Sequence, residues 1–422
     1  MEKTYTCRNG LRVLVTEMPH MYSASVGLWV KVGGRHENRF QKGLSHFLEH
    51  MVFKGTKTRT CQEIAETIEG VGGYLNACTS KEYTCFYAKT LDKDYFKAID
   101  ILTDMAFHPL FNLDDIQKEK DVVLEEIKMY MDSPSQLIHD YLDEVLWGSD
   151  HPMGFWLTGK EDDVRSFNKD DCHAFLKEHY FAKNIVISVA GKVKAQDTFD
   201  FIEGLDIGSS DNEYVPPRSF AMQRENFVIK WIKKDIEQTQ MAMAFYSYAK
   251  DHPLRYAAEI LGIFLGGNMS SYLYKELREK RGIVYDIRAS SETYSDVGVF
   301  EISAGLDADK VLEMLKIISE KLEDLKVSLI QEEELERAKA YFKGRVLFSM
   351  ERPDSRMSFS GERLLIMGKT VAVEDILKKI DEVSLKDIQV VASEIFLKGH
   401  FSAVGIGSKD MSEDIKGFMD AV

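Results

Sequence analysis

Alternating apolar and polar positions in the first half of the chain predict strands, and apolar positions spaced three or four residues apart predict helices. Strands are expected at 11–15 and 23–30, with a further strand pair within 72–88. Helices are expected at about 44–53, 61–70, 93–106 and 114–131. The last helix should end where Asp132 and Ser133 precede Pro134, because proline cannot continue a helix.

The second half of the chain follows the same order of elements. It predicts a helix at 256–265, strands within 283–304, and helices at 308–325 and 331–350. Each half ends its long helix similarly, with Met131 three residues before Pro134 and Met350 three before Pro353, an offset of 219 residues. Proline often follows a helix end, so this correspondence alone is weak evidence for a repeat. Together with the element order it favours an internal duplication.

Between the two halves lies a stretch with few core-forming residues, including Gly208 and the pair Pro216 and Pro217. We expect it to be a linker over 206–219, between an N-terminal domain of 1–205 and a C-terminal domain of 220–422. The predicted fold class is α+β. Each of the two tandem, structurally similar domains should be a mainly antiparallel sheet flanked by helices.

Composition narrows the possible functions. The chain of 422 residues carries a formal charge of -15, which argues against binding nucleic acid through its phosphates. No apolar stretch is long enough to span a membrane and the N-terminus lacks an apolar leader, so we expect a cytoplasmic protein. The five cysteines form no C-x-x-C pair, which is typical of a reducing compartment. Cys78 and Cys85 would face opposite sides of an unbroken strand.

The helix expected at 44–53 carries the candidate chemistry. His46 and His50 lie four residues apart, on one face and about one turn apart, a separation that a tetrahedral metal accepts. Glu49 lies beside them and could reach a metal-bound water without being a ligand. The alternative is a chance pair of histidines on an ordinary helix, but the three residues in this spacing favour a metal site.

Two histidines leave a zinc ion in need of a third protein ligand, with a fourth position for water. On the helix expected at 114–131, Glu119 and Glu126 interrupt an otherwise apolar face. A helical glutamate is most often simply solvated. On this apolar face, however, Glu126 becomes the leading candidate ligand, and Glu119 could orient a ligand or hold a proton.

The H-x-x-E-H from His46 to His50, followed 76 residues later by Glu126, resembles the pitrilysin/insulinase superfamily of zinc peptidases. The similarity is to its short-chain branch, which includes the mitochondrial processing peptidases and their bacterial homologues, and it covers essentially the whole chain. It implies one zinc ion per chain, with His46, His50 and Glu126 as ligands. It also implies Glu49 as the general base and Glu119 as the supporting acid.

The same resemblance assigns roles in the second half of the chain. Arg278 and Tyr285, seven residues apart, match a pair that contacts the substrate carbonyl from the opposite half of a clamshell. Family members of this length take that half from a second chain. The resemblance therefore implies a homodimer in which each zinc site is completed in trans.

For the substrate, the resemblance places Asn76 and Ala77 on an edge strand to which an extended peptide adds as one more strand. The mitochondrial enzymes carry an acidic pair that binds substrate arginine, and this chain has Gln136 and Asp140 there. Asp140 fits that pattern and Gln136 does not. A preference for arginine is therefore in doubt.

The leading hypothesis is a zinc metalloendopeptidase that hydrolyses extended or unfolded peptides inside a dimeric clamshell chamber. The alternative is a non-catalytic peptide-binding or scaffold subunit of the same fold that retains zinc. A third possibility is an enzyme that cleaves only alongside a different partner chain. In every case the expected partners are peptides and protein chains, without nucleic acid or membrane.

Overall fold

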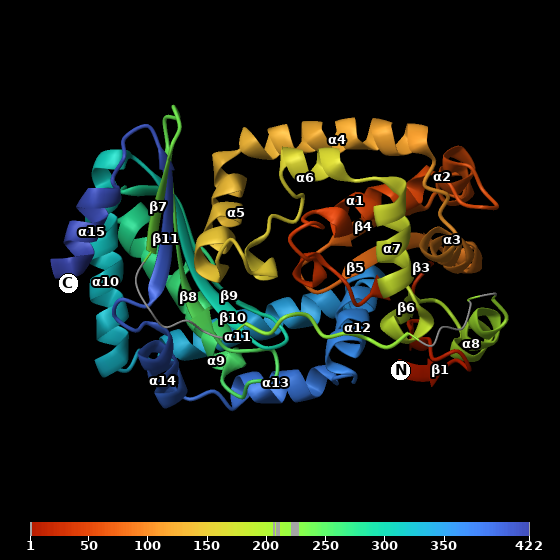
Figure 1. The fold of residues 1–422 in the computed structure, drawn as a ribbon. Helices are drawn as coiled ribbons and strands as arrows, with labels where there is room; N and C mark the ends of the chain where they lie inside the picture. Colours follow the sequence, from red (N-terminus) through yellow and green to blue (C-terminus); the bar gives the residue numbers. More distant parts are fainter. Residues whose placement is uncertain (1, 206, 208–211, 221–227, 422) are drawn as a thin grey trace. The chain divides into compact units, whose positions relative to one another are not determined.

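The computed structural model describes residues 2–205, 207, 212–220 and 228–421, which form two compact units (Figure 1). The first unit comprises Met1–Lys128, Phe155–Arg218 and Leu347–Val371. The second comprises Met129–Gly154, Ser219–Val346 and Ala372–Val422. Residues 206 and 208–211 of the expected linker at 206–219 lie outside the described residues.

The first unit is built on a six-stranded sheet in the order β1-β2-β6-β3-β5-β4. Its strands are β1 (Glu2–Thr6), β2 (Arg12–Glu17), β3 (Ser23–Val30), β4 (Tyr74–Thr79), β5 (Thr84–Leu91) and β6 (Ile185–Gly191). Neighbouring strands run antiparallel, except that β2 and β6 are parallel. The strand β4 therefore lies at one edge of this sheet.

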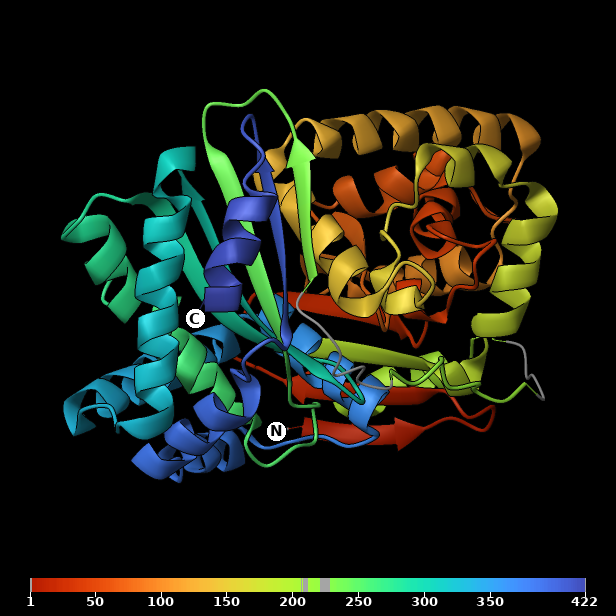
Figure 2. The ribbon, with the colours of Figure 1, turned by 60° about the vertical axis from the view of Figure 1, so that its left-hand side comes forward.

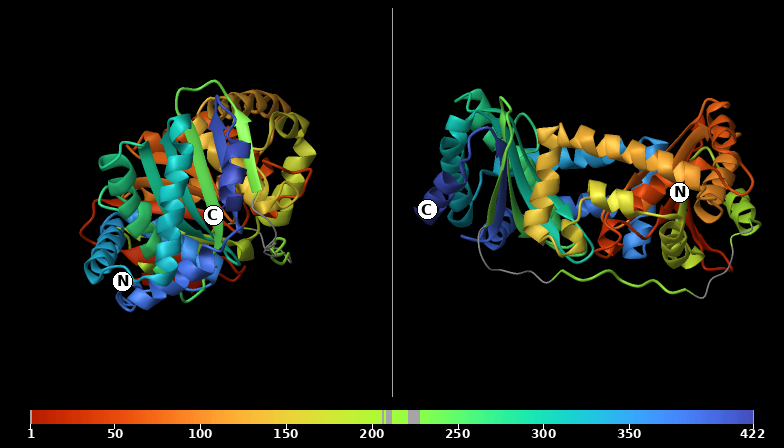
Figure 3. Two further views of the ribbon diagram at one scale, coloured as in Figure 1. Left: turned by 90° about the vertical axis from the view of Figure 1, so that its left-hand side faces the viewer. Right: turned by 45° about the horizontal axis from the view of Figure 1, so that its top comes forward.

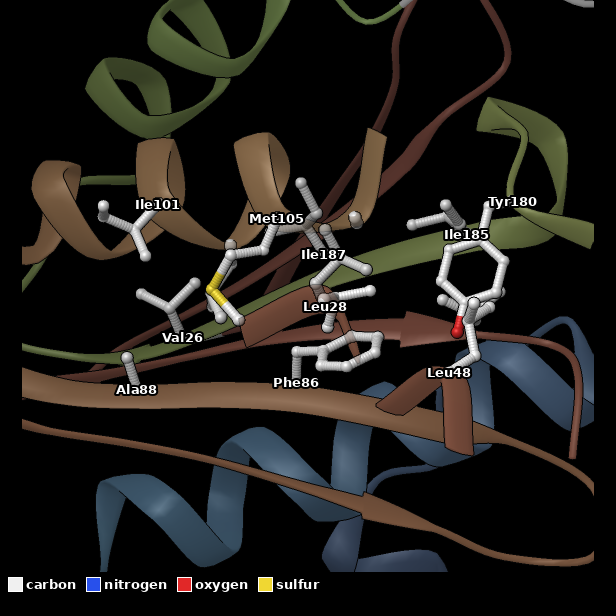
Figure 4. Packing of buried hydrophobic residues seen from close by; sticks show 14 of the residues in the cluster. Val26, Leu28, Leu48, Phe86, Ala88, Ile101, Met105, Tyr180, Ile185 and Ile187 are labelled. Carbon is white, nitrogen blue, oxygen red and sulfur yellow. The ribbon is translucent and has the colours of Figure 1, made fainter. Parts of the chain in front are cut away.

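Both faces of the first sheet are covered by helices. One face packs against α1 (Leu44–Met51), α2 (Cys61–Glu69) and α3 (Tyr95–Phe107). Figure 4 shows this packing, with Leu28 and Phe86 on the sheet below Met105 of α3. The other face packs against α12 (Pro353–Met367), which lies on β3 and β6. Because both faces are covered, seven of the eight residues of β3 are buried.

The second unit contains a five-stranded sheet in the order β7-β11-β8-β10-β9. Its strands are β7 (Val228–Lys233), β8 (Thr239–Ser247), β9 (Val284–Thr293), β10 (Gly298–Leu306) and β11 (Phe401–Gly407). This order repeats that of five strands of the first sheet, β2-β6-β3-β5-β4. In each sheet the first two of these five strands are parallel. Arg12 pairs with Val186, and Val228 pairs with Ser402, so both parallel pairs join residues 174 positions apart. The expected fold class of two similar α+β domains is confirmed.

Helices also cover both faces of the second sheet (Figure 2). The helices α9 (Arg255–Gly266), α10 (Val311–Val327) and α14 (Leu385–Ile395) form a layer on one side, with α9 against β9. The helix α5 (Pro134–Trp147) packs against β8 and β11 on the other side. The right-hand view of Figure 3 shows the strands between α10 and α5.

Neither compact unit is a single continuous stretch of the chain. The contiguous domains expected at 1–205 and 220–422 differ from the units, because α5 belongs to the second unit and α12 to the first. Each follows directly after a long helix, α4 (Leu113–Met131) or α11 (Glu332–Met350). An apolar helix face shows that a helix is buried, but it does not show which sheet it covers.

The remaining helices complete the two units. They are α6 (Glu161–Ser166), α7 (Lys169–His179), α8 (Ala195–Glu203), α13 (Val373–Asp381) and α15 (Ser412–Ala421). In the part of the chain that the structure describes, no helix is both long enough and apolar enough to cross a membrane.

Candidate metal centre

The helix α1 is fixed at its N-terminus by Glu37, which is almost completely buried. Its two carboxylate oxygens accept hydrogen bonds from the backbone N–H groups of Gly43 at 2.8 Å and Ser45 at 2.7 Å. These donors have no partner within the helix, so Glu37 caps it. Gly43 has a φ of 85°, and a Cβ there would lie 2.6 Å from the backbone of Thr158, so only glycine fits.

One face of α1 is buried in the core and the opposite face carries the candidate metal ligands. Leu44, Phe47, Leu48 and Met51 are buried, which holds the helix in a fixed orientation. The His46 and His50 rings therefore lie together, with their centroids 4.7 Å apart. The helix predicted from the H-x-x-E-H motif is present.

The third candidate ligand, Glu126, comes from α4. Its Oε2 lies 3.7 Å from Nε2 of His46 and 3.5 Å from Nε2 of His50. One ligand atom from each residue can be chosen so that all three lie within 4.8 Å of one another. Two imidazole nitrogens and one carboxylate oxygen are a donor set that catalytic zinc accepts while a fourth position stays open. The residues present therefore fit a zinc ion.

The electrostatics of the two histidines differ. Burial, together with the neighbouring His50, lowers the pKa of His46 to about 4, so this ring is neutral, as a metal ligand must be. Burial also opposes a charge on His50, but the carboxylates of Glu119 and Glu126 outweigh it and raise its pKa to about 9. Metal binding at His50 must therefore displace a proton.

Behind the candidate ligands lies the buried carboxylate of Glu119. The Oε1 atom of Glu119 is 2.8 Å from Nδ1 of His50, and its Oε2 is 2.5 Å from Nζ of Lys54. Burial raises the pKa of Glu119, but the hydrogen bonds from His50 and Lys54 outweigh it, and the net pKa is lowered. An ionised Glu119 orients His50 so that Nε2 faces Glu126.

The candidate general base, Glu49, lies on the same helix. Burial raises its pKa, and a hydrogen bond donated by the Thr79 hydroxyl to Oε2 partly offsets this effect. Thr79 is the last residue of the edge strand β4, so this bond links the helix to the strand. A carboxylate with a raised pKa is suited to accepting a proton near neutral pH.

The residues expected to bind substrate lie in both units. Asn76 and Ala77 are on β4, at the edge of the first sheet, and the side chain of Asn76 is exposed. Asp140 and Gln136 are on α5, which belongs to the second unit.

The second unit also carries Arg278 and Tyr285. Arg278 lies in a π-helical turn at Tyr274–Glu279, and its Nη1 donates to the Tyr274 hydroxyl at 2.5 Å. Tyr285 is on β9, 52% exposed, and its hydroxyl donates to Asp307 at 3.4 Å. The first unit thus contains the candidate metal ligands, Glu49 and Glu119, and the second contains the Arg/Tyr pair.

Three residues of the centre were not predicted from the sequence. Lys54 follows His50 by four residues, so its helical spacing could have indicated it. Thr79 follows Ala77 by two residues on the same face of β4. No periodic signal marks Glu37, because it precedes the helix and reaches it through an irregular loop.

Comparison with known families decides the relationship. A family model described as "Insulinase (Peptidase family M16)" matches residues 12–152, and one described as "Peptidase M16 inactive domain" matches 166–342. The chain belongs to peptidase family M16. The resemblance noted from the sequence is confirmed, in the short two-domain form of this family.

Individual relatives of this M16 chain span nearly its whole length. "Uncharacterized zinc protease YmxG" of Bacillus subtilis is 36% identical over 96% of this chain and 98% of its own. A protein of Mycobacterium leprae, also named an uncharacterized zinc protease, is 34% identical over 94% of this chain and 90% of its own. The fold matches the crystal structure of a protease from Helicobacter pylori, with a TM-score of 0.90, 23% identity, and coverage of 96% and 99% of the two chains.

Proposed function

We propose that this M16 chain is a zinc metalloendopeptidase that cleaves extended or unfolded peptides. The observation that carries the proposal is the convergence of His46, His50 and Glu126, with Glu49 on the same helix. The names of the relatives support zinc as the metal. The proposed stoichiometry is one zinc ion per chain.

The chemistry that zinc supplies in such a site is Lewis-acid activation of water, whose pKa falls from 15.7 to about 7. Glu49 takes the proton of the attacking water and returns it to the leaving amine nitrogen. Because Thr79 donates to Oε2 of Glu49, Oε1 is the atom proposed to carry this proton. Glu119 keeps His50 oriented while this occurs.

We place the peptide on the free edge of β4 as an additional antiparallel strand, beside Asn76 and Ala77. Its backbone then pairs with the strand that ends at Thr79, next to Glu49. This mode requires an extended substrate, because a folded protein offers few unpaired strands. Asp140 is the proposed contact for a basic side chain.

Arg278 and Tyr285 are the proposed donors to the carbonyl oxygen at which negative charge develops. We propose that the chain is a homodimer in which this pair comes from the second protomer. Removing one such donor typically costs about 3 to 4 kcal/mol of transition-state stabilisation. Gel filtration with cross-linking tests the assembly, and a mixed dimer of Glu49→Gln and Arg278→Ala chains tests completion in trans.

The alternative is a peptide-binding subunit that retains zinc without turnover. One observation favours this alternative, because the second matching family model is described as an "inactive domain". That match begins at residue 166, however, beyond all candidate ligands. Zinc analysis combined with a quenched-peptide assay separates the two functions. Bound zinc without any cleavage supports the subunit.

The decisive variant is Glu49→Gln, which should retain zinc and lose peptide cleavage. Glu126→Gln should lose zinc as well. A matched control is Glu125→Gln, because Glu125 is exposed on the outer face of α4, where it forms an ion pair with Lys128. Full turnover by Glu49→Gln would contradict the assignment of the base.

A further inference from the structure

Two cysteines lie directly opposite each other beside the candidate peptide-binding edge. Cys78 on β4 and Cys85 on β5 are cross-strand partners in the antiparallel register. The sequence analysis places them on opposite sides only if the strand is unbroken, and the strand is broken here. The chain reverses between Ser80 and Tyr83, where the Ser80 N–H donates to the Tyr83 carbonyl at 2.8 Å, so both thiols lie on one face.

The two thiols differ in access. Cys78 is exposed, whereas Cys85 is buried in the cluster that contains Trp29 and Met357. A hydrogen bond from Cys85 lowers the pKa of Cys78, and burial opposes this effect only in part. An oxidant can therefore reach one sulfur of the pair, and that sulfur is the more readily ionised one.

The separation suits a covalent bond. Residues directly opposite each other in antiparallel strands have Cα atoms about 4.5 to 5.5 Å apart. Disulfides form when that separation is about 4.4 to 6.8 Å. The Cα separation therefore already suits a disulfide, and only a small local shift of the two strands is needed to join the sulfur atoms.

The other three cysteines lack this arrangement. Burial raises the pKa of Cys7 and of Cys172 to about 12, so both thiols resist oxidation. Cys61 is exposed on α2, at its first residue. None of the three is a cross-strand partner of another cysteine in the described strands.

We propose that Cys78 and Cys85 form a reversible disulfide that weakens peptide binding at the edge of β4. Formation of the bond is independent of the proposed peptidase function, but its effect on peptide turnover rests on that function. Asn76 and Thr79 lie two residues before and one residue after Cys78 on the same strand.

The oxidant in this proposal is a hydroperoxide. The Cys78 thiolate attacks a peroxide oxygen, the O–O bond breaks, and the departing hydroxide takes a proton to become water, leaving a sulfenic acid on Cys78. The Cys85 sulfur then attacks the Cys78 sulfur and the S–O bond breaks. The released hydroxide takes the Cys85 proton, so two thiols and one hydrogen peroxide give one disulfide and two waters.

Reduction by a dithiol reverses the change. One thiolate of the reductant attacks the exposed Cys78 sulfur, Cys85 leaves as the thiolate, and the second thiol of the reductant releases Cys78. The dithiol becomes a disulfide in the process. An exposed sulfur makes this exchange accessible, in contrast to a fully buried disulfide.

The expected effect on substrate follows from the position of the bond. Directly opposite Cβ atoms lie about 4.5 to 5.5 Å apart, but a disulfide holds them about 3.8 Å apart. Closing this gap draws β4 toward β5 next to Asn76 and Ala77, the residues beside which the peptide is proposed to bind. We expect peptide KM to rise at least threefold, with bound zinc unchanged.

The test treats the zinc-loaded chain with one equivalent of hydrogen peroxide and maps its peptides by mass spectrometry. The expected product joins Cys78 to Cys85 with the loss of two hydrogen masses, and dithiothreitol restores both thiols. Cys78→Ser and Cys85→Ser should show no change in KM on oxidation. Cys61→Ser is the matched control and should respond like the unaltered chain.

Failure of this proposal can be distinguished from failure of the proposed function. Absence of the Cys78–Cys85 link overturns the disulfide. A link that leaves the affinity of a fluorescent peptide for the Glu49→Gln chain unchanged overturns its effect on binding. If the reduced, zinc-loaded chain cleaves no peptide, the peptidase function fails, and the same affinity measurement still decides the effect of the disulfide.

Discussion

Glu119 contacts His50 through the ring nitrogen that faces away from Glu126, with Oε1 and Nδ1 2.8 Å apart. Because this bond fixes Nδ1, the Nε2 atom of His50 is the one presented to a metal. Glu119 is held in turn by Lys54. The site is therefore ordered through residues that do not themselves contact the metal.

Weakening this bond should weaken zinc binding. The variant Glu119→Gln keeps the shape of the side chain but removes its charge, and we expect the zinc dissociation constant to rise about 10- to 100-fold. Competition with a chromophoric chelator measures this. Glu125→Gln, on the exposed side of α4, serves as the control, and equal dissociation constants for the two variants would contradict the role of Glu119.

The hydrogen bond from Thr79 to Glu49 should matter for turnover rather than for zinc. Thr79→Val removes the donor at similar volume, and a hydrogen bond to a charged group contributes about 1.5 to 3 kcal/mol. We expect kcat to fall at least tenfold at unchanged zinc content. Thr79→Ser restores the hydroxyl and should recover most of kcat; if it behaves like Thr79→Val, packing is the cause instead.

The cap formed by Glu37 should make stability depend on pH. Burial raises the pKa of Glu37 to about 7, although hydrogen bonds from Ser45 and Gly43 and the charge of Lys81 lower it in part. The folded state therefore binds this proton more tightly than the unfolded chain. The contribution of Glu37 is most favourable below about pH 4.5 and is lost as the pH rises to about 7, on the order of 3 kcal/mol.

A comparison of the unaltered chain with Glu37→Gln isolates this effect, because other titrating groups are common to both. Thermal unfolding midpoints at pH 5 and pH 8 provide the measurement. The unfolding midpoint of the unaltered chain, relative to that of the variant, should be lower at pH 8 than at pH 5. A relative midpoint that rises with pH would show that the ionised carboxylate is the favoured form of the cap.

The position of α12 predicts how a fragment behaves. Residues 1–218 contain the whole first sheet but lack α12, so the face that includes Trp29 and Leu14 is left uncovered. We expect this fragment to bind a hydrophobic dye and to unfold without a cooperative transition. Adding 347–371 as a fused segment should restore the transition, and a cooperative fragment without that segment would contradict the importance of α12.

A single core substitution tests the same packing within the intact chain. Met357 of α12 is buried, and its carbonyl accepts a hydrogen bond from the Ser188 hydroxyl at 2.9 Å. Met357→Ala should reduce the free energy of unfolding by about 2 to 5 kcal/mol. Met129→Ala is the control, because Met129 is 61% exposed and should change it little.

Local patterns explain which features could be predicted from the sequence. The helix bearing His46 and His50 and the carboxylate at Glu126 follow from spacing along single helices, and the structure brings these residues together. The cap by Glu37 could not be predicted, because it depends on the path of a loop. The pairing of Cys78 with Cys85 depends on where the hairpin turns. A predicted turn that is wrong by one residue would place the two side chains on opposite faces of the sheet.

The exchange of α5 and α12 between the units has a consequence for recombination between relatives. A crossover within 206–219 would join the first half of one parent to the second half of another. Each sheet would then receive its covering helix from the other parent, so both cores would combine side chains that had not adapted to each other. Recombinants in which each sheet and its covering helix come from the same parent should therefore fold far more often.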